Sequence, residues 1–308
     1  MPEVIEIKKY SDFLRKILKN KFISDITIKK GRYKTHKPFP LYNKIKKLLP
    51  LKVIDIKTKG KFLYFILEND YYIFSTLGLH GGWTYCKTPT NKFIFPKLLD
   101  YINNNRLQQY KKTALNNLNV EFKIKSSNSN SIKLYYYDSL SFGTLKVVNN
   151  KKDLEIKLKS IGPDILDKDT TFDVFLHQIN KIKNKQKEKA IGLILMNQKI
   201  ISGIGNYLRS DILWLSKISP FRKICDLSIK ELSLIYKNAR LLTWGDYNRP
   251  KAIKYNIIKK SDKLPKDYNR NFFIYNSKED IYGNEVVKEE LYNGSHKRFI
   301  YWIPKRQK

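Results

Sequence analysis

Hydrophobic and polar positions alternate with two different periods along this chain. From Val4 to Leu18, apolar residues recur at the three- and four-residue spacing of an amphipathic helix. Short alternating segments rich in Ile, Val, Tyr and Phe follow, and several such strands separated by turn signals are typical of a sandwich or barrel. The polar "SSNSNS" at 126–131 predicts a hairpin loop. We expect strands at 22–30, 51–58, 61–67, 71–76, 119–125, 132–137 and 144–148.

After about residue 150 the apolar spacing becomes helical. The lysine-rich "KIKNKQKEK" at 181–189 is typical of a solvated helix face. From about residue 261 the segments are short and strand-like again, ending in "HKRFIYWIPKRQK". We expect helices near 170–182, 188–197, 206–216 and 228–244. The pattern therefore predicts an α+β chain with a β-rich half, a helical half and a terminal β-hairpin.

The charge of the chain indicates its class of partner. The 308 residues are 42% hydrophobic, enough for a sizeable core, but 61 Lys and Arg stand against 28 Asp and Glu, a net charge of +33. AT-rich coding also favours Lys, Asn, Ile and Tyr, yet it would leave Glu and Asp equally free to rise. A polyanion, above all nucleic acid, explains the excess better. With no run of 18 apolar residues and no signal-peptide core, we expect an intracellular protein without a membrane partner.

Cysteine and histidine usage argues against a structural metal. Cys86 and Cys225 are the two cysteines, far apart in the chain, so neither a disulfide framework nor a four-thiolate zinc site can form. The four histidines are also scattered. We expect no metal and no cofactor.

Two short stretches could carry chemistry. In "QKIISGIGNYLRSDILW" (198–214) an apolar run meets the turn Gly203–Asn206 before a new helix, and glycines with free N–H groups at a helix start suit a phosphate. A tight connection is the alternative. The chain opens "MPEVIEI", where Pro2 and Glu3 also fit a simple preference for the first turn of a helix.

Taken together, segments along essentially the whole chain resemble the formamidopyrimidine-DNA glycosylase and endonuclease VIII family of base-excision repair enzymes. The resemblance implies an N-terminal β-sandwich domain with an N-terminal helix, and a helical helix-two-turn-helix domain that ends in a zincless-finger β-hairpin. The expected boundaries are 1–148 for the catalytic domain, 149–165 for a linker, 166–260 for the DNA-binding domain and 261–308 for the hairpin. The matching segments are "MPEVIEI" (1–7), "TKGKFLYFIL" (58–67), "TLGLHGGW" (76–83), "YDSLSFGTL" (137–145), "IGPDIL" (161–166) and "NQKIISGIGNYLRSDILWLSKISP" (197–220).

The resemblance assigns catalytic roles to four residues. Removal of Met1 would leave Pro2 with a free secondary amine, which can attack the sugar of a damaged nucleotide and hold it as a Schiff base. Positive potential at the helix start favours the unprotonated amine. Glu3 would shuttle protons. Lys61 and Arg298 would contact phosphates and assist catalysis, although Lys61 alone could equally be a strand-edge lysine.

Further roles follow from the same resemblance. Asn206 and Gly205 would bind the DNA backbone. Leu79 would fill the void left by the extruded base, and Phe142 would act as a wedge. Glu6 and Asp211 match acids that the family uses around its site; for each, a helix-surface carboxylate is the equal alternative.

Two departures from the family pattern bear on specificity. Leu140 and Ser141 stand at the two arginine positions of the family's "DPRRFG", which leaves open how the strand opposite the lesion is contacted. The four zinc-cysteine positions hold residues that cannot replace thiolates, namely Tyr282, Glu285, Ile303 and Arg306. This resembles the zincless-finger, endonuclease VIII-like branch, in which aromatic packing replaces the ion; a basic hairpin tail is the alternative.

The expected function is a bifunctional DNA glycosylase and abasic-site lyase that excises oxidised bases, with pyrimidines favoured over 8-oxoguanine. The expected partner is damaged double-stranded DNA, with single-stranded DNA as a further candidate, and we expect a monomer located with DNA. The competing class is a non-catalytic DNA-binding or damage-sensing protein that retains the fold. The altered wedge and Ile5 in place of a second proline favour that alternative, while Pro2, Glu3 and Lys61 oppose it. A general RNA-binding protein is more remote.

Overall fold

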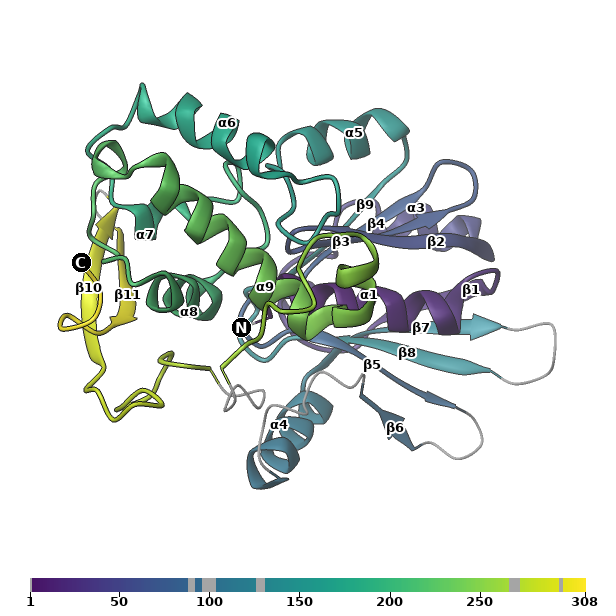
Figure 1. Ribbon diagram of the computed structural model, residues 1–308. Helices are drawn as coiled ribbons and strands as arrows, with labels where there is room; N and C mark the ends of the chain where they lie inside the picture. Colours follow the sequence, from purple (N-terminus) through teal and green to yellow (C-terminus); the bar gives the residue numbers. More distant parts are fainter. Residues whose placement is uncertain (1, 88–91, 96–103, 126–130, 266–271, 294–295) are drawn as a thin grey trace. The chain divides into compact units, whose positions relative to one another are not determined.

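The computed structural model describes residues 2–87, 92–95, 104–125, 131–265, 272–293 and 296–308 (Figure 1). These residues fall into two units: the first contains Pro2 and residues 6–159, and the second contains residues 3–5 and 160–308. Within the described ranges, no helix is both long enough and apolar enough to cross a membrane.

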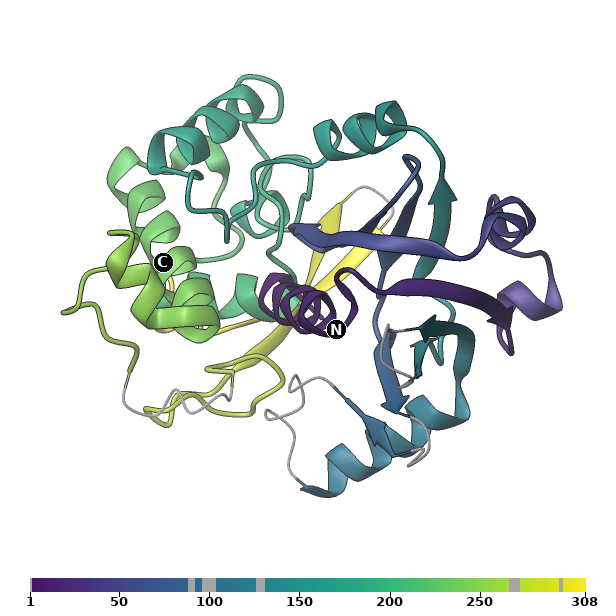
Figure 2. The same cartoon turned by 90° about the vertical axis from the view of Figure 1, so that its right-hand side faces the viewer.

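In the first unit, the described strands form one antiparallel sheet in the order β6-β5-β8-β7-β1-β2-β3-β4-β9. β1 and β2 are paired only at Phe22 with Lys52 and Ile23 with Leu51, so the sheet turns a corner there into two halves (Figure 2). The predicted strands are confirmed, each to within two residues of its expected ends. The bounds are β1 Phe22–Ile28, β2 Leu51–Lys59, β3 Phe62–Leu67, β4 Tyr72–Thr76, β5 Gly82–Lys87, β6 Phe93–Ile94, β7 Leu118–Lys125, β8 Ile132–Tyr137 and β9 Thr144–Val148.

The two halves of the sheet share one core. The Trp83 ring of β5 is fully buried and lies 5.1 Å, centroid to centroid, from Phe65 of β3 in the other half. Helix α1 (Val4–Leu18) contributes Ile7, Tyr10 and Leu14 to the same core, as its periodicity predicts. The predicted β-sandwich with an N-terminal helix is therefore confirmed.

The first unit also contains helices that the pattern did not predict. Their sequences are short or polar, so they carry weak periodicity; α4 reads "NNRLQQYKKTALN". α5 occupies much of the segment expected to be a linker. The predicted 126–131 loop lies, except for Ser131, outside the described residues. The bounds are α2 Arg32–Thr35, α3 Tyr42–Leu48, α4 Asn104–Asn116 and α5 Lys151–Lys159.

The second unit is helical and ends in a β-hairpin, as predicted. The expectation of one helix over 188–197 is wrong, because Ala190 is extended and pairs with Lys223, which confines α7 to four residues. The last helix runs ten residues beyond its expected end and is kinked at Asn248, just before Pro250. The bounds are α6 Phe172–Lys183, α7 Ile191–Ile194, α8 Asn206–Ser216, η1 Ile224–Asp226, α9 Ile229–Lys254, β10 Val287–Asn293 and β11 His296–Trp302.

Candidate functional site

The start of helix α8 is capped by an acid from the beginning of the chain. The Glu3 carboxylate accepts hydrogen bonds from the backbone N–H groups of Gly205 (2.5 Å), Tyr207 (2.9 Å) and Leu208 (3.4 Å). Glu3 is fully buried, and the residue at the helix start is a glycine with no side chain to act as a cap. A carboxylate at this position satisfies the orphan donors and complements the helix dipole.

The two glycines of the turn make room for the start of the chain, Gly205 for Glu3 and Gly203 for Val4. A Cβ on Gly205 would lie 2.2 Å from the Glu3 carboxyl carbon. Gly203 has φ +105°, and a Cβ there would lie 2.8 Å from that of Val4, whose N–H donates to the Gly203 carbonyl. This corrects the expectation that the N–H groups at this helix start are free for a phosphate, because Glu3 occupies those of Gly205, Tyr207 and Leu208.

Arg209 links the helix start to the terminal hairpin. Its fully buried guanidinium donates to the Asn206 side-chain oxygen, to the Phe299 carbonyl (2.7 Å) and to the Gly192 carbonyl (3.1 Å). Burial lowers the pKa of Arg209 to about 10, with the Glu3 carboxylate opposing and Arg298 reinforcing that shift. Arg209 therefore remains positively charged at neutral pH. Sequence reasoning missed it, although an arginine in the otherwise apolar "NYLRSDILW" is a signal.

The hydrogen bond from Arg209 fixes the orientation of the Asn206 amide. Its oxygen faces Arg209, so its nitrogen faces away from Arg209. Burial raises the pKa of Tyr275, while a hydrogen bond with the Asn206 side chain works in the opposite direction. A hydrogen bond that lowers the pKa of a phenol is one donated to its oxygen. The half-buried Asn206 side chain thus faces Arg209 with its oxygen and Tyr275 with its nitrogen.

Asp211 is buried inside the second unit. Its carboxylate accepts 3.2 Å hydrogen bonds from the backbone N–H groups of Phe273 and Ile274. Burial raises the pKa of Asp211 to about 7, although these hydrogen bonds act to lower it. The alternative of a helix-surface carboxylate is therefore wrong for Asp211. Glu6, on α1 in the first unit, is half-buried.

Arg298 lies exposed on β11, opposite Leu291 of β10. Buried Leu291 and Ile300 pack the hairpin against Leu193 of α7. The neighbouring Phe299 carbonyl is the one that Arg209 binds. The structure thus brings Glu3, Gly205 and Asn206 together at the α8 start and links Asn206 through Arg209 to the strand that carries Arg298.

Of the residues at the four expected zinc positions, Tyr282 and Arg306 are in contact with each other, whereas Glu285 is exposed. The Arg306 guanidinium carbon lies 4.7 Å from the ring centroid of Trp214 and 5.2 Å from that of Tyr282, and the two rings are stacked. Ile303 is buried. A cation in contact with two aromatic faces does not fit a metal-ligand set. Among the described side chains, no group of three or more His, Cys, Asp and Glu is placed to hold a metal ion.

In the first unit, Pro2 is half-buried just before α1. Lys61 lies in the two-residue turn between β2 and β3, after Gly60 with φ 55°. The Lys61 side chain is half-buried, and the strand begins one residue later, at Phe62.

Leu79 and Phe142 lie on two loops that are in contact. A Cβ on Gly78 would lie 2.6 Å from the Gly143 nitrogen and 2.9 Å from the Phe142 Cβ. Leu79 is 39% exposed and Phe142 is 61% exposed. The first unit therefore presents two apolar tips side by side.

The loop that carries Phe142 is held by hydrogen bonds to Asp138, which precedes it, and from Arg32 of α2. The Asp138 carboxylate accepts hydrogen bonds from the N–H groups of Leu140 (3.1 Å) and Gly143 (2.6 Å). Arg32, another residue that sequence reasoning missed, donates to the carbonyls of Ser141 (3.1 Å) and Gly143 (2.6 Å). Rigid support of this kind suits a side chain that must be inserted into another structure.

The first unit is a β-sandwich, and the second is a helical unit that ends in a β-hairpin. In the second unit, Glu3 caps the helix that follows the turn Gly203–Asn206. These features define a two-domain α+β protein of the helix-two-turn-helix class. Residues 1–145 match the formamidopyrimidine-DNA glycosylase N-terminal domain, and residues 161–243 match the formamidopyrimidine-DNA glycosylase H2TH domain. The chain belongs to the formamidopyrimidine-DNA glycosylase family.

Curated relatives and solved structures agree with this assignment. The chain is 30% identical to the formamidopyrimidine-DNA glycosylase of Ureaplasma parvum over 78% of this chain and 76% of the relative. It is 27% identical to that of Mycoplasma mobile, over 95% and 89%. The fold is similar to that of Lactococcus lactis formamidopyrimidine-DNA glycosylase in complex with DNA containing an oxidised pyrimidine, with a TM-score of 0.71, 22% identity and 99% of each chain covered.

Proposed function

We propose that this protein is a bifunctional DNA glycosylase and abasic-site lyase of base-excision repair, acting on damaged double-stranded DNA as a monomer. The observation that carries the proposal is the burial of Glu3 under the α8 start, one peptide bond from Pro2. A chain end anchored by three hydrogen bonds holds its terminal amine within narrow limits, as a nucleophile requires. The named relatives are DNA glycosylases, which supports the same activity.

Pro2 is the nucleophile once Met1 has been removed. Its secondary amine nitrogen attacks C1′ of the damaged nucleotide, and the N-glycosidic bond breaks, with its electron pair and a proton leaving on the base. The Glu3 carboxylate takes the proton that the Pro2 nitrogen loses after its attack and passes it to the sugar oxygen as the ring opens to the iminium form of the Schiff base. Loss of a C2′ proton then expels the 3′ phosphate, a second elimination expels the 5′ phosphate, and water releases Pro2.

Phosphate recognition falls to Lys61, Asn206 and Arg298. Arg298 is exposed on its strand, and Asn206 is half-buried at the first position of α8. Lys and Arg neutralise phosphates and release counterions, in keeping with the net charge of +33. Gly205 contributes by admitting Glu3 rather than by donating to the phosphate.

Leu79 and Phe142 are inserted into the duplex. Extruding a damaged base costs a few kcal/mol and leaves a hole in the stack. Two exposed apolar tips held side by side suit the filling of that hole. Residues 1–148 form the catalytic domain in this scheme, 149–165 the connection, and 166–260 the helix-two-turn-helix domain; Glu6 and Asp211 support the site.

Residues 261–308 form a zincless finger. The contact of Arg306 with the Trp214 and Tyr282 rings supports a hairpin held by packing instead of by zinc. In this proposal the protein is of the endonuclease VIII-like type, and its preferred substrates are oxidised pyrimidines.

A panel of duplexes and single strands tests the proposal. Each carries one lesion, either an oxidised pyrimidine, 8-oxoguanine or an abasic site, and base release and strand cleavage are scored separately. We expect release of oxidised pyrimidines ahead of 8-oxoguanine and cleavage at the abasic site. Tight binding to lesion DNA with neither reaction would instead establish a damage-sensing protein.

A further inference from the structure

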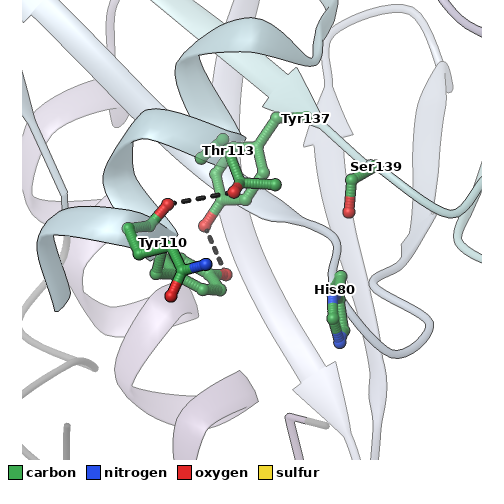
Figure 3. A pocket seen from close by; sticks show the side chains of 7 residues that line it. His80, Tyr110, Thr113, Tyr137 and Ser139 are labelled. Atoms are coloured by element: carbon green, nitrogen blue, oxygen red, sulfur yellow. Dashed lines mark hydrogen bonds between the residues drawn. The ribbon is translucent and has the colours of Figure 1, made fainter. Parts of the chain in front are cut away.

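A cavity of about 370 Å³ opens in the first unit beside the two loops with exposed apolar tips (Figure 3). Tyr110 and Thr113 of α4 and Tyr137 of β8 lie on one side of it, and His80 and Ser139 lie on the other. Gln109 and Ala114 of α4 complete the lining. Its size falls within the about 300–1,000 Å³ typical of small-molecule sites.

Tyr110 and Tyr137 of the lining belong to a row of three hydrogen-bonded tyrosines, whose third member is the buried Tyr10. Tyr137 is hydrogen-bonded to Tyr10 at 3.0 Å and to Tyr110 at 2.9 Å. Burial raises the pKa of all three phenols, so their hydroxyls stay protonated at neutral pH. The row contains three hydroxyl hydrogens but only two hydrogen bonds between the tyrosines, so one hydroxyl hydrogen can be donated to another group. The site combines aromatic surfaces with hydroxyl, amide and imidazole groups.

The cavity is continuous with the duplex-inserting loops. His80 directly follows Leu79, and Ser139 directly precedes Leu140, which is 43% exposed. On the outer wall, α4 carries Lys111 and Lys112 next to Tyr110. These cations suit a nearby phosphate backbone.

We propose that this cavity binds the nucleobase opposite the lesion after that base has left the stack. The inference rests on the proposed function, which places Leu79 and Phe142 in the duplex. A nucleobase is flat and aromatic with polar edges, and proteins hold extruded bases by stacking and by hydrogen bonds to those edges. The base opposite the lesion has already lost its pairing partner, so extruding it costs only the lost stacking.

Leu140 supports the same inference. It extends from the braced loop between Asp138 and Gly143, and an aliphatic side chain offers no hydrogen-bond donor to an unpaired base. Three apolar tips, on Leu79, Leu140 and Phe142, can fill the stack but offer the opposite base no hydrogen bond from their side chains. The cavity beside them provides the polar partners that the tips lack.

Cross-linking of the full-length wild-type chain tests the location. The probe is a duplex with 5-iododeoxyuridine opposite a tetrahydrofuran abasic analogue, irradiated and mapped by peptide mass spectrometry. We expect the cross-link at Tyr110 or His80. A cross-link confined to Phe142, or none at either cavity residue, would overturn the proposal.

A pair of variants tests the energetic contribution. Gln109 lines the cavity, whereas Gln108 precedes it on α4 and does not; both are exposed, so Gln109→Trp fills the cavity and Gln108→Trp is its matched control. Dissociation constants are measured for the analogue opposite thymine and opposite a second abasic analogue. The wild type and Gln108→Trp should prefer the duplex with thymine by about fivefold or more, the low end for stacking one base. Gln109→Trp should lose this preference.

If Gln109→Trp kept the preference for the duplex with thymine, the cavity would not be the site that binds the opposite base. Borohydride trapping on a natural abasic site, run with the same proteins, reports on the proposed lyase alone. Failed trapping with an intact Tyr110 cross-link would overturn the lyase and support the cavity; trapping without the cross-link would do the reverse.

Discussion

The carboxylate of Glu3 accepts a 2.9 Å hydrogen bond from the backbone N–H of Tyr207, 204 positions further along the chain. The third residue of the protein is therefore the N-terminal cap of a helix in the second unit, and a side chain at Gly205 would collide with it. The residue before this cap is the proposed nucleophile. One carboxylate thus has two separable roles, as a structural cap and as a proton shuttle.

Glu3→Gln should lower both stability and activity. A glutamine keeps one acceptor oxygen but turns its amide toward a backbone donor, and leaving such a buried donor unpaired costs about 1–3 kcal/mol. Loss of the proton shuttle should slow base excision by about 10²–10⁴-fold. Urea unfolding and single-turnover excision measure the two effects.

Glu231→Gln is the matched control for this variant. Glu231 forms the capping box of α9 with Ser228 in the same unit. The Glu231→Gln variant should have a lower free energy of unfolding and an unchanged rate of base excision. If Glu3→Gln also kept its rate, Glu3 would be a cap only.

Pro2→Gly should remove most of the Schiff base. Glycine supplies a flexible primary amine in place of the constrained secondary one, and such loss of positioning can cost about 100-fold. Borohydride trapping on a duplex with one abasic site measures it. The intact mass of the trapped wild-type adduct should lack Met1, because an acylated proline nitrogen cannot form a Schiff base. Full activity in protein that retains Met1 would contradict the assignment.

The sequence predicts the elements better than the contacts between them. Seven of the nine described strands of the sheet follow the predicted segments, whereas β5 and β6 were not predicted. α8 begins and ends where the turn Gly203–Asn206 and the helical spacing predict. Helix α4 was missed because its sequence is polar on most sides. The cavity that α4 lines was missed with it.

The buried charges were missed for a different reason. Arg209 was not singled out, and for Asp211 a helix-surface carboxylate was an equal alternative, because a single sequence does not show which carbonyl and N–H groups will surround a charge. Glu3 reads as a first-turn acid, since its partners are 202 to 205 positions away. The family resemblance marked Glu3 and Asp211 as important but did not indicate these contacts.

Asp211 should make stability fall as pH rises. The folded state holds its pKa at about 7, above the ordinary value of 3.8, so between these values the folded chain keeps a proton that the unfolded chain releases. The stability that this proton provides is lost as pH rises through that window, at about 1.4 kcal/mol per pH unit. From pH 5 to pH 8, the free energy of unfolding should drop about 2–3 kcal/mol more in the wild type than in Asp211→Asn, which cannot titrate. Parallel urea titrations that show no difference would exclude a proton on Asp211.

Arg209→Lys should weaken DNA binding, and a second buried arginine provides its control. A lysine has one ammonium group and cannot donate in a fixed fork to the Asn206 oxygen and the Phe299 carbonyl. Arg240 is likewise buried in the second unit and donates to the carbonyls of Ile165 and Asp167. Both Arg→Lys variants should lose about 1–3 kcal/mol of stability.

Their effects on DNA should differ, because only Arg209 orients Asn206 and holds the strand that carries Arg298. Arg209→Lys should raise the KM for abasic-site cleavage about tenfold, the cost of weakening one or two phosphate hydrogen bonds, while kcat changes little. Arg240→Lys should leave KM unchanged. Equal KM values in the two variants would reduce Arg209 to a packing role, whereas the expected split would make it the residue that positions two phosphate-binding groups from inside the fold.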